Sequence, residues 1–224
     1  MNPLNRIQRY FFAREQKIRE FIFILYAVGI AGTAIPLTRD FFILLTPFVL
    51  FISLFILFIF HERGPGLKVA LVFLSIFIVS FAVEAAGVAT GKIFGSYTYG
   101  SGLGIKLFDT PLLIGFNWIL LVYCTSAIFE KVPVHSIVKI TGASLLMVIY
   151  DLVMEQVAPV MDMWSFEGGT VPAVNYLSWF VLAFIFHSAV KVSGIRIANK
   201  FGPLLFWCQG AFFLILLVIF KLIL

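Results

Sequence analysis

The sequence predicts an all-α integral membrane protein with about seven transmembrane helices, on three observations. Of its 224 residues, 62% are hydrophobic and only 12% are charged, against about 25% charged in an ordinary soluble domain. Apolar runs near the ~20 residues that a spanning helix needs recur along the chain. The basic residues divide unequally between the segments that separate these runs. A polytopic bundle in a lipid bilayer accounts for all three.

Seven apolar runs form the candidate spans. They are Phe21–Pro36, Phe41–Phe60, Val69–Val88, Pro111–Phe129, Ile137–Ala158, Val174–Val190 and Pro203–Phe220. The first is short and only Leu37–Asp40 separates it from the second, so this pair is the weakest assignment. We expect one domain over residues 1–224, with no inverted repeat and no broken helix. Linkers are short except Gly91–Thr110 and Pro159–Pro172, which are rich in Gly, Tyr and Trp.

The basic residues set the expected orientation, because Lys and Arg favour the cytoplasmic side. With seven spans and a cytoplasmic N-terminus, 12 of the 16 Lys and Arg residues fall in inner segments. These twelve are Arg6, Arg9, Arg14, Lys17, Arg19, Arg63, Lys68, Lys131, Lys139, Lys191, Arg196 and Lys200; the outer four are Arg39, Lys92, Lys106 and Lys221. Residues 1–20 are therefore expected to be a basic cytoplasmic anchor of a protein in the bacterial inner membrane. Anionic lipid is its expected partner, and nucleic acid is not.

Three carboxylates lie inside predicted spans, where charge is costly and often functional. Glu84 is in the third run, and Asp151 and Glu155 are in the fifth. The latter two are four residues apart and share a helix face. At ~1.5 Å per residue, Glu84 lies ~24 Å beyond Lys68 and Glu155 ~24 Å beyond Lys139. We therefore expect these acids at one depth, in the outer half of the membrane.

Two amides approach the same level from the outer side, Asn117 in the fourth run and Asn175 at the start of the sixth. No Lys or Arg is expected at that depth, so the acids cannot all ionise and at least one should hold a proton. Satisfied polar groups that tie helices together are the alternative interpretation. Three carboxyls at one level without a basic partner favour a functional proton site.

The chemistry of such a site is narrowed by what the sequence lacks. The three histidines, His61, His135 and His187, lie at the cytoplasmic edge and lack the paired spacing of a di-iron enzyme. There is no Asp-rich pair for a magnesium diphosphate. The GxGxG string at 100–104 falls in an outer loop, where tight turns explain it better than a nucleotide. The last run has no central lysine for a retinal Schiff base. We therefore expect acid–base chemistry on an apolar substrate, with no metal and no cofactor.

Several motifs together resemble the CruF-type membrane carotenoid hydratases, over about residues 80 to 180. They are Val83–Gly91 (VEAAGVATG), Phe94–Tyr99 (FGSYTY), Asp151–Glu155 with Ala158 and Pro159, Trp164, Pro172–Tyr176 (PAVNY) and Trp179. That family adds water across the C1–C2 double bond of an acyclic carotenoid ψ-end group, giving a tertiary alcohol. The resemblance implies a hydro-lyase that acts on a lycopene-type or γ-carotene-type substrate.

The expected acid–base mechanism and the resemblance to the hydratases together suggest roles for nine residues. Glu84, Asp151 and Glu155 are the expected catalytic acids, one of which protonates C2 while another orients the water that captures the C1 cation. Asn117 and Asn175 would position this water, Asn117 on the depth argument alone. The aromatic residues would line the substrate channel or form an interfacial belt; they are Tyr97, Tyr99, Trp164 and Trp179.

Two other functions fit the same acids. A lycopene cyclase forms the same cation and captures it with an internal alkene, but the water-holding amides favour a hydratase. A proton-coupled transporter would also use buried carboxyls, but it should have inverted repeats or broken helices. The expected partners are the carotenoid and membrane lipid, and other carotenoid-pathway enzymes are further candidates.

Overall fold

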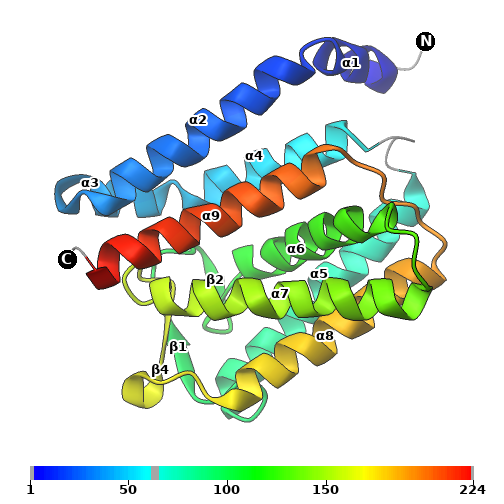
Figure 1. The fold of residues 1–224 in the computed structure, drawn as a ribbon. Helices are drawn as coiled ribbons and strands as arrows, with labels where there is room; N and C mark the ends of the chain where they lie inside the picture. Colours follow the sequence, from blue (N-terminus) through cyan, green and yellow to red (C-terminus); the bar gives the residue numbers. More distant parts are fainter. Residues whose placement is uncertain (1–2, 62–65, 223–224) are drawn as a thin grey trace.

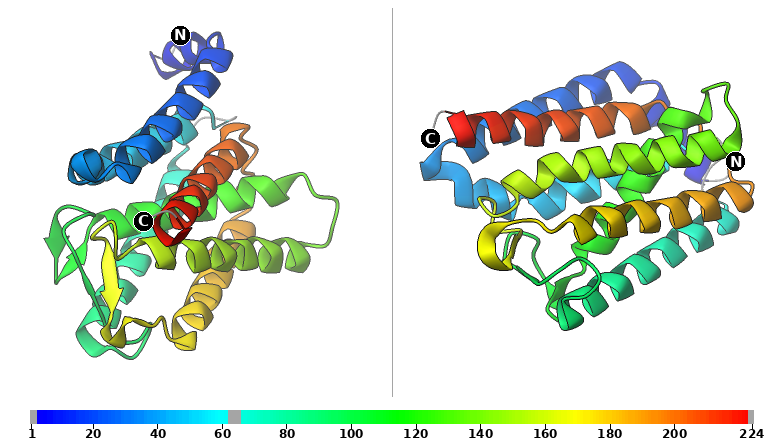
Figure 2. Two further views of the ribbon diagram at one scale, coloured as in Figure 1. Left: turned by 60° about the vertical axis from the view of Figure 1, so that its left-hand side comes forward. Right: turned by 60° about the horizontal axis from the view of Figure 1, so that its bottom comes forward.

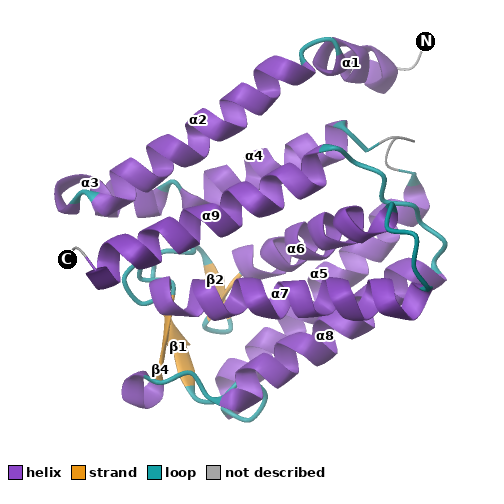
Figure 3. Cartoon of the chain, in the orientation of Figure 1, coloured by secondary structure: helices purple, strands orange, loops and turns teal. Residues whose placement is uncertain are grey.

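The computed structural model describes residues 3–61 and 66–222, and in them helices form a bundle with two small sheets at one end (Figures 1 and 3). The helices are α1 (Pro3–Phe12), α2 (Glu15–Ala34), α3 (Pro36–Leu44), α4 (Thr46–Ile59), α5 (Leu67–Thr90), α6 (Leu113–Glu130), α7 (Ser136–Val157), α8 (Ala173–Val192) and α9 (Phe201–Leu222). The strands are β1 (Tyr97–Tyr99), β2 (Lys106–Leu107), β3 (Thr110–Pro111) and β4 (Trp164–Phe166), and the 3-10 turn η1 is Glu167–Gly169.

The bundle is that of a polytopic membrane protein, as the sequence predicts. Five of the described helices are long and apolar enough to cross a membrane, namely α5 to α9, and the bent pair of α3 and α4 makes a sixth if it is one span. Large apolar side chains face outward, including Phe41 and Phe48 at 62% and 64% exposure. Such a surface suits lipid and not water. Helix α2 carries four charges in its first six residues, so the seventh span stays a prediction.

From α2 on, and with the α3–α4 pair taken as one unit, successive helices run in opposite directions between two ends of the bundle (Figure 1). One end holds α1 and the linkers 131–135 and 193–200 (Figures 1 and 2). The other end holds the turn between α2 and α3, the linkers 91–112 and 158–172, and the end of α9. The ends match the predicted inner and outer segments, but which side of the membrane each faces stays a prediction. Arg63, one of the expected inner cations, lies outside the described residues.

The second predicted span is broken. Residues 41–60 were expected as one continuous helix, but α3 and α4 meet at Leu45 with a bend of 49°. The cause is Pro47, which has no N–H to donate to the carbonyl of Ile43 and whose ring clashes with that group in a continuous helix. The expectation that no helix is broken is therefore wrong at this position.

The turn between α2 and α3 is held by side chains that bind the free carbonyls at the end of α2. The hydroxyl of Thr38 donates to the carbonyl oxygen of Gly32 at 2.7 Å. The Arg39 guanidinium donates to the carbonyl oxygens of Thr33 and Ala34, at 3.0 and 3.4 Å. The last carbonyls of a helix need such partners, so Arg39 acts as a cap for α2.

Helix α6 is the centre of the bundle. Of the residues in its apolar stretch, 61% are buried, against 22–33% in the other long candidate spans, α5, α7, α8 and α9. It packs against α5, α7 and α9. Because α5 and α7 flank it, the acids of those two helices face each other beside the first turns of α6.

Candidate active site

The three predicted acids are buried near the end of the bundle that holds the sheets. Glu84 lies on α5 at 3% exposure, and Asp151 and Glu155 lie on α7 at 0% and 5%. Buried carboxyls need hydrogen-bond donors. These donors come from aromatic and amide side chains on the two long linkers and on α6 and α8.

Glu84 accepts three hydrogen bonds. The hydroxyls of Tyr97 and Tyr99 donate to Oε2 at 2.7 and 2.9 Å. The indole Nε1 of Trp118 donates to Oε1 at 3.1 Å. Donors aimed at both oxygens favour the ionised form of a carboxyl. Glu84 is thus the acid whose surroundings best support a negative charge.

Two glycines explain how the linker after α5 returns to Glu84. A Cβ at Gly87 would lie 2.7 Å from the ring of Phe94, so only a glycine lets that ring pack on the helix. Gly91 ends α5 in the left-handed region, at φ 63°, as C-terminal glycines often do. The chain therefore reverses directly after the helix, and Tyr97 and Tyr99 come back over Glu84.

The pairing of β1 with β4 aims the aromatic residues at the acids. Tyr99 is opposite Trp164 in the antiparallel register. Side chains alternate along a strand, so Tyr97 and Tyr99 point inward while Thr98 between them is exposed. Both tyrosines are at most 9% exposed. They therefore do not form an interfacial belt, whose side chains would be exposed.

The acids of α7 share one amide. The Nδ2 atom of Asn175 donates to Oδ2 of Asp151 and to Oε1 of Glu155, both at 3.0 Å. The indole Nε1 of Trp164 donates to Oε2 of Glu155 at 2.7 Å. Asn175 was expected to orient water, but here its two N–H groups join the acids of one helix to the start of α8.

Asp151 has the poorest set of partners of the three acids. Its Oδ1 is buried without a hydrogen-bond partner among the described residues. An unpaired buried acceptor costs about 1–3 kcal/mol. A proton bound to Asp151 would reduce that cost, because a neutral carboxylic acid is less costly to bury than a carboxylate.

Glu84 and Glu155 both line a cavity of about 10 Å³. This is room for roughly one water molecule. Asn175 also lines the cavity, whereas Asp151 lies behind it and does not. The rest of the wall is almost entirely aromatic: Phe94, Tyr97, Tyr99, Trp164, Phe166 and Trp179, with Ile114.

The other predicted residues lie next to these contacts. Trp179 stacks on Trp118, with ring centroids 4.4 Å apart, so it supports a donor to Glu84. Asn117 lines a neighbouring cavity of about 30 Å³ together with Trp164. Sequence reasoning missed Trp118, which is fully buried. Its place inside a span, away from the interfaces where Trp is common, is the signal that could have found it.

The described ion pairs lie elsewhere, at Glu15 and Glu130. Lys106, in the nearby linker, donates to the carbonyl oxygen of Tyr99.

Burial, reinforced by the charge of Glu84, raises the pKa of Tyr97 and of Tyr99 well above its ordinary value. Both hydroxyls therefore stay protonated and keep donating at neutral pH.

A model of the family described as "Carotenoid biosynthesis protein" matches residues 41–221. The chain belongs to this family. The match includes the acids, both long linkers and all helices from α4 to α8. Neither the search of curated proteins nor that of solved structures found a match. Carotenoids are apolar polyenes, and the aromatic wall around the acids suits molecules of that kind.

Proposed function

We propose that this carotenoid biosynthesis protein is a carotenoid 1,2-hydratase, which adds water to the C1–C2 double bond of an acyclic ψ-end group. The observation that carries the proposal is the pair of carboxyls, Glu84 and Glu155, that line one cavity with room for about one water. The motif resemblance names the same reaction. The family match supports the substrate class.

In the first step Glu155 acts as the acid. Its proton goes to C2, the π electrons of the alkene form the new C–H bond, and C1 becomes a tertiary cation. The wall rings of Tyr99, Trp164 and Trp179 present faces that attract a cation. The Glu84 carboxylate, supported by three donors, supplies the opposite charge where positive charge develops.

In the second step the water in the cavity attacks C1. Its oxygen forms the C1–O bond and its proton passes to Glu84, so the elements of one water are added across the bond. A proton then returns from Glu84 to Glu155, and the starting state is restored without an oxidant or reductant. Asp151 does not touch the cavity, so we assign it a positioning role through Asn175.

The same cation is the intermediate of a cyclase, and the lining of the cavity favours the hydratase. A cyclase must exclude water so that an internal alkene captures C1. Here the space between the acids has polar groups on two sides, Glu84 and Glu155, with Asn175. A water needs two to four such partners. Hydration is therefore favoured over ring closure.

Expression in a lycopene-producing bacterium tests the function. The pigment should gain the mass of one or two water molecules and carry tertiary hydroxyls, without added cofactor. A ring-containing isomer of unchanged mass would identify a cyclase. Unchanged lycopene, with the protein present in the membrane, would contradict the hydration of lycopene and favour a transporter or a different substrate. The buried carboxyls also fit a transporter, and the broken α3–α4 pair is a second feature in its favour.

A further inference from the structure

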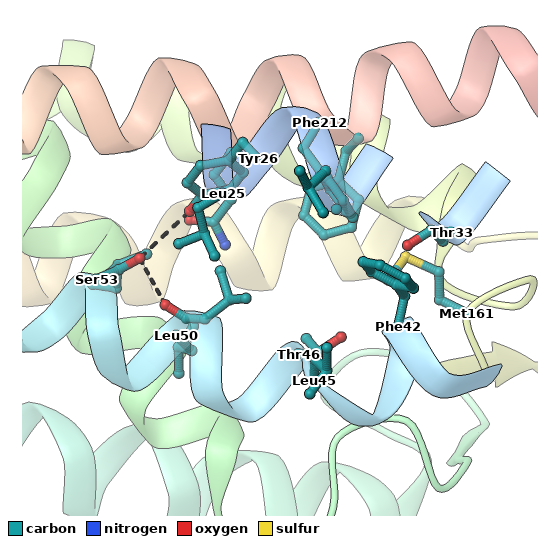
Figure 4. A pocket seen from close by; sticks show the side chains of 16 residues that line it. Leu25, Tyr26, Thr33, Phe42, Leu45, Thr46, Leu50, Ser53, Met161 and Phe212 are labelled. Carbon is teal, nitrogen blue, oxygen red and sulfur yellow. Dashed lines mark hydrogen bonds between the residues drawn. The ribbon is translucent and has the colours of Figure 1, made fainter. Parts of the chain in front are cut away.

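An apolar chamber of about 170 Å³ lies between α2, the α3–α4 pair and α9. Figure 4 shows Leu25, Tyr26 and Phe212 on one side and Leu45 and Thr46 on the other. The Tyr26 hydroxyl lies 3.5 Å from the Ser53 hydroxyl, which itself donates to the carbonyl oxygen of Val49. These polar groups of the wall have partners, so the chamber is suited to hydrocarbon.

The chamber lies next to the cavities of the candidate active site, with which it shares wall residues. Thr46, Leu50, Gln209 and Phe213 line both the chamber and the cavity of about 30 Å³ that contains Asn117. Ile114 and Trp164 line both that cavity and the one between the carboxyls. The three cavities therefore lie in series, from an apolar chamber to the acids.

Gln209 marks the junction of the first two cavities. Its Oε1 atom is buried and has no hydrogen-bond partner among the described residues. An unpaired acceptor is unfavourable, and an amide inside an apolar helix is uncommon. A polar group at this position suits a passage that must admit water as well as hydrocarbon.

The broken helix points to a ligand independently. Leu45 and Thr46, at the break between α3 and α4, line the chamber. At membrane depth, irregular backbone is tolerated where it is buried in protein or lines a cavity.

We propose that this chamber binds the isoprenoid chain of the substrate and directs its ψ-end through the junction at Gln209 to Glu155. The proposal rests on the hydratase function. A cavity of about 150 Å³ takes up a ring of benzene size, so the chamber of about 170 Å³ has room for about one isoprene unit. The remaining chain leaves past Val28, a chamber residue that is 51% exposed, into the lipid.

Gly29 offers a direct test because it lines the chamber and has no side chain. A Cβ there would lie 3.4 Å from the ring of Phe212, an ordinary contact. Gly29→Ala should therefore fold normally, and Gly29→Leu should fill the chamber. Ala27→Leu is the matched control, because Ala27 is on the same helix, is exposed and does not line the chamber.

The measurement is the amount of lycopene that remains bound to the protein purified from lycopene-producing cells, read by absorbance, together with the hydrated fraction of the pigment. Gly29→Leu should lower both about tenfold or more, on the scale of overpacking effects. Gly29→Ala should lower them less, and Ala27→Leu should leave them unchanged. Unchanged retention and hydration in a well-folded Gly29→Leu would overturn the chamber proposal and leave the hydratase standing. Failure of the unaltered protein to hydrate lycopene at all would instead refute the hydratase.

Discussion

The three acids differ in what surrounds each of them, and this difference divides their roles. Glu84 has three donors and Glu155 has two, and both line the cavity. Asp151 has one donor and one unpaired oxygen, and it lies behind Asn175. Because only Glu84 and Glu155 of the three line the cavity, we propose the chemistry for these two and a supporting role for Asp151.

Conservative substitutions should separate these roles. Glu84→Gln and Glu155→Gln remove a titrating group at nearly constant size, so each should lower hydration of lycopene ~100-fold or more. Asp151→Asn should cost less, because this residue acts through Asn175. Glu167→Gln is the control, since Glu167 is exposed in η1. Product per unit of membrane protein is the measurement.

Full activity in both cavity variants would contradict the mechanism, because no other carboxyl lines the cavity in the described part of the chain. Loss of protein from the membrane would instead indicate a structural role. We expect the amides to fold, because an uncharged group is less costly to bury.

At the scale of single residues, the sequence predicts the acids and four of the five side chains that donate to them, and misses Trp118. Charge inside apolar runs revealed Glu84, Asp151 and Glu155. Their common level follows from helical rise alone. Trp118 and Gln209 were not predicted, because an aromatic or amide side chain in an apolar run can face lipid, a neighbouring helix or a cavity. Only the packing of the helices decides which of these three the side chain faces.

At the scale of elements, the linkers hold more structure than their composition indicates. The glycines at 100–104 were expected to allow tight turns, and close packing explains two of them. A Cβ on Gly100 would meet the side chain of Asp162 at 2.1 Å, and one on Gly102 would meet the carbonyl of Met161 at 2.3 Å. The strand pairs were not predicted, since strands of two or three residues carry too little periodicity.

Asp162 fastens the two long linkers together, and its removal should loosen them. The backbone N–H and the hydroxyl of Ser101 both donate to Oδ2 of Asp162. Asp162→Ala should raise hydrogen–deuterium exchange of residues 100–104 on the order of fivefold, the scale of one hydrogen bond. Asp162→Asn keeps an acceptor and tolerates the positive φ of 49°, so its effect should be smaller.

The same contact should depend on acidity. The Ser101 hydroxyl and N–H lower the pKa of Asp162 below its ordinary value. A lowered pKa means that the stabilisation is present above the unfolded pKa of about 3.9 and is lost as the pH falls through the folded value. Protection of residues 100–104, corrected for the intrinsic exchange rate, should therefore be constant at neutral pH and fall below about pH 4. Equal exchange in Asp162→Ala and the unaltered protein would refute this role of Asp162 in joining the linkers.

At the scale of the whole molecule, the position of α2 relative to the bilayer sets the number of spans. The helix packs along α9 and runs from the end that holds α1 to the end that holds the long linkers (Figure 1). Its 20 residues are long enough to cross the hydrocarbon. Its first turns are charged, however, and Glu15 pairs with Arg19 and Lys200. These contacts suit a helix whose start lies at a membrane surface.

Reporters fused at four points should settle both the number of spans and their orientation. If α2 spans the membrane, reporters at the N-terminus and after Lys200 should be cytoplasmic, because Lys and Arg concentrate at that end. Reporters at Leu37 and between Gly100 and Gly104 should be external. An N-terminus and Leu37 on the same side would make α2 an interfacial helix and leave the six spans from the α3–α4 pair to α9. The site at Glu84 survives that result, because its contacts come from α5 to α8 and the linkers. The chamber does not, because its wall from Leu25 to Thr33 requires α2 to lie beside α9 within the membrane.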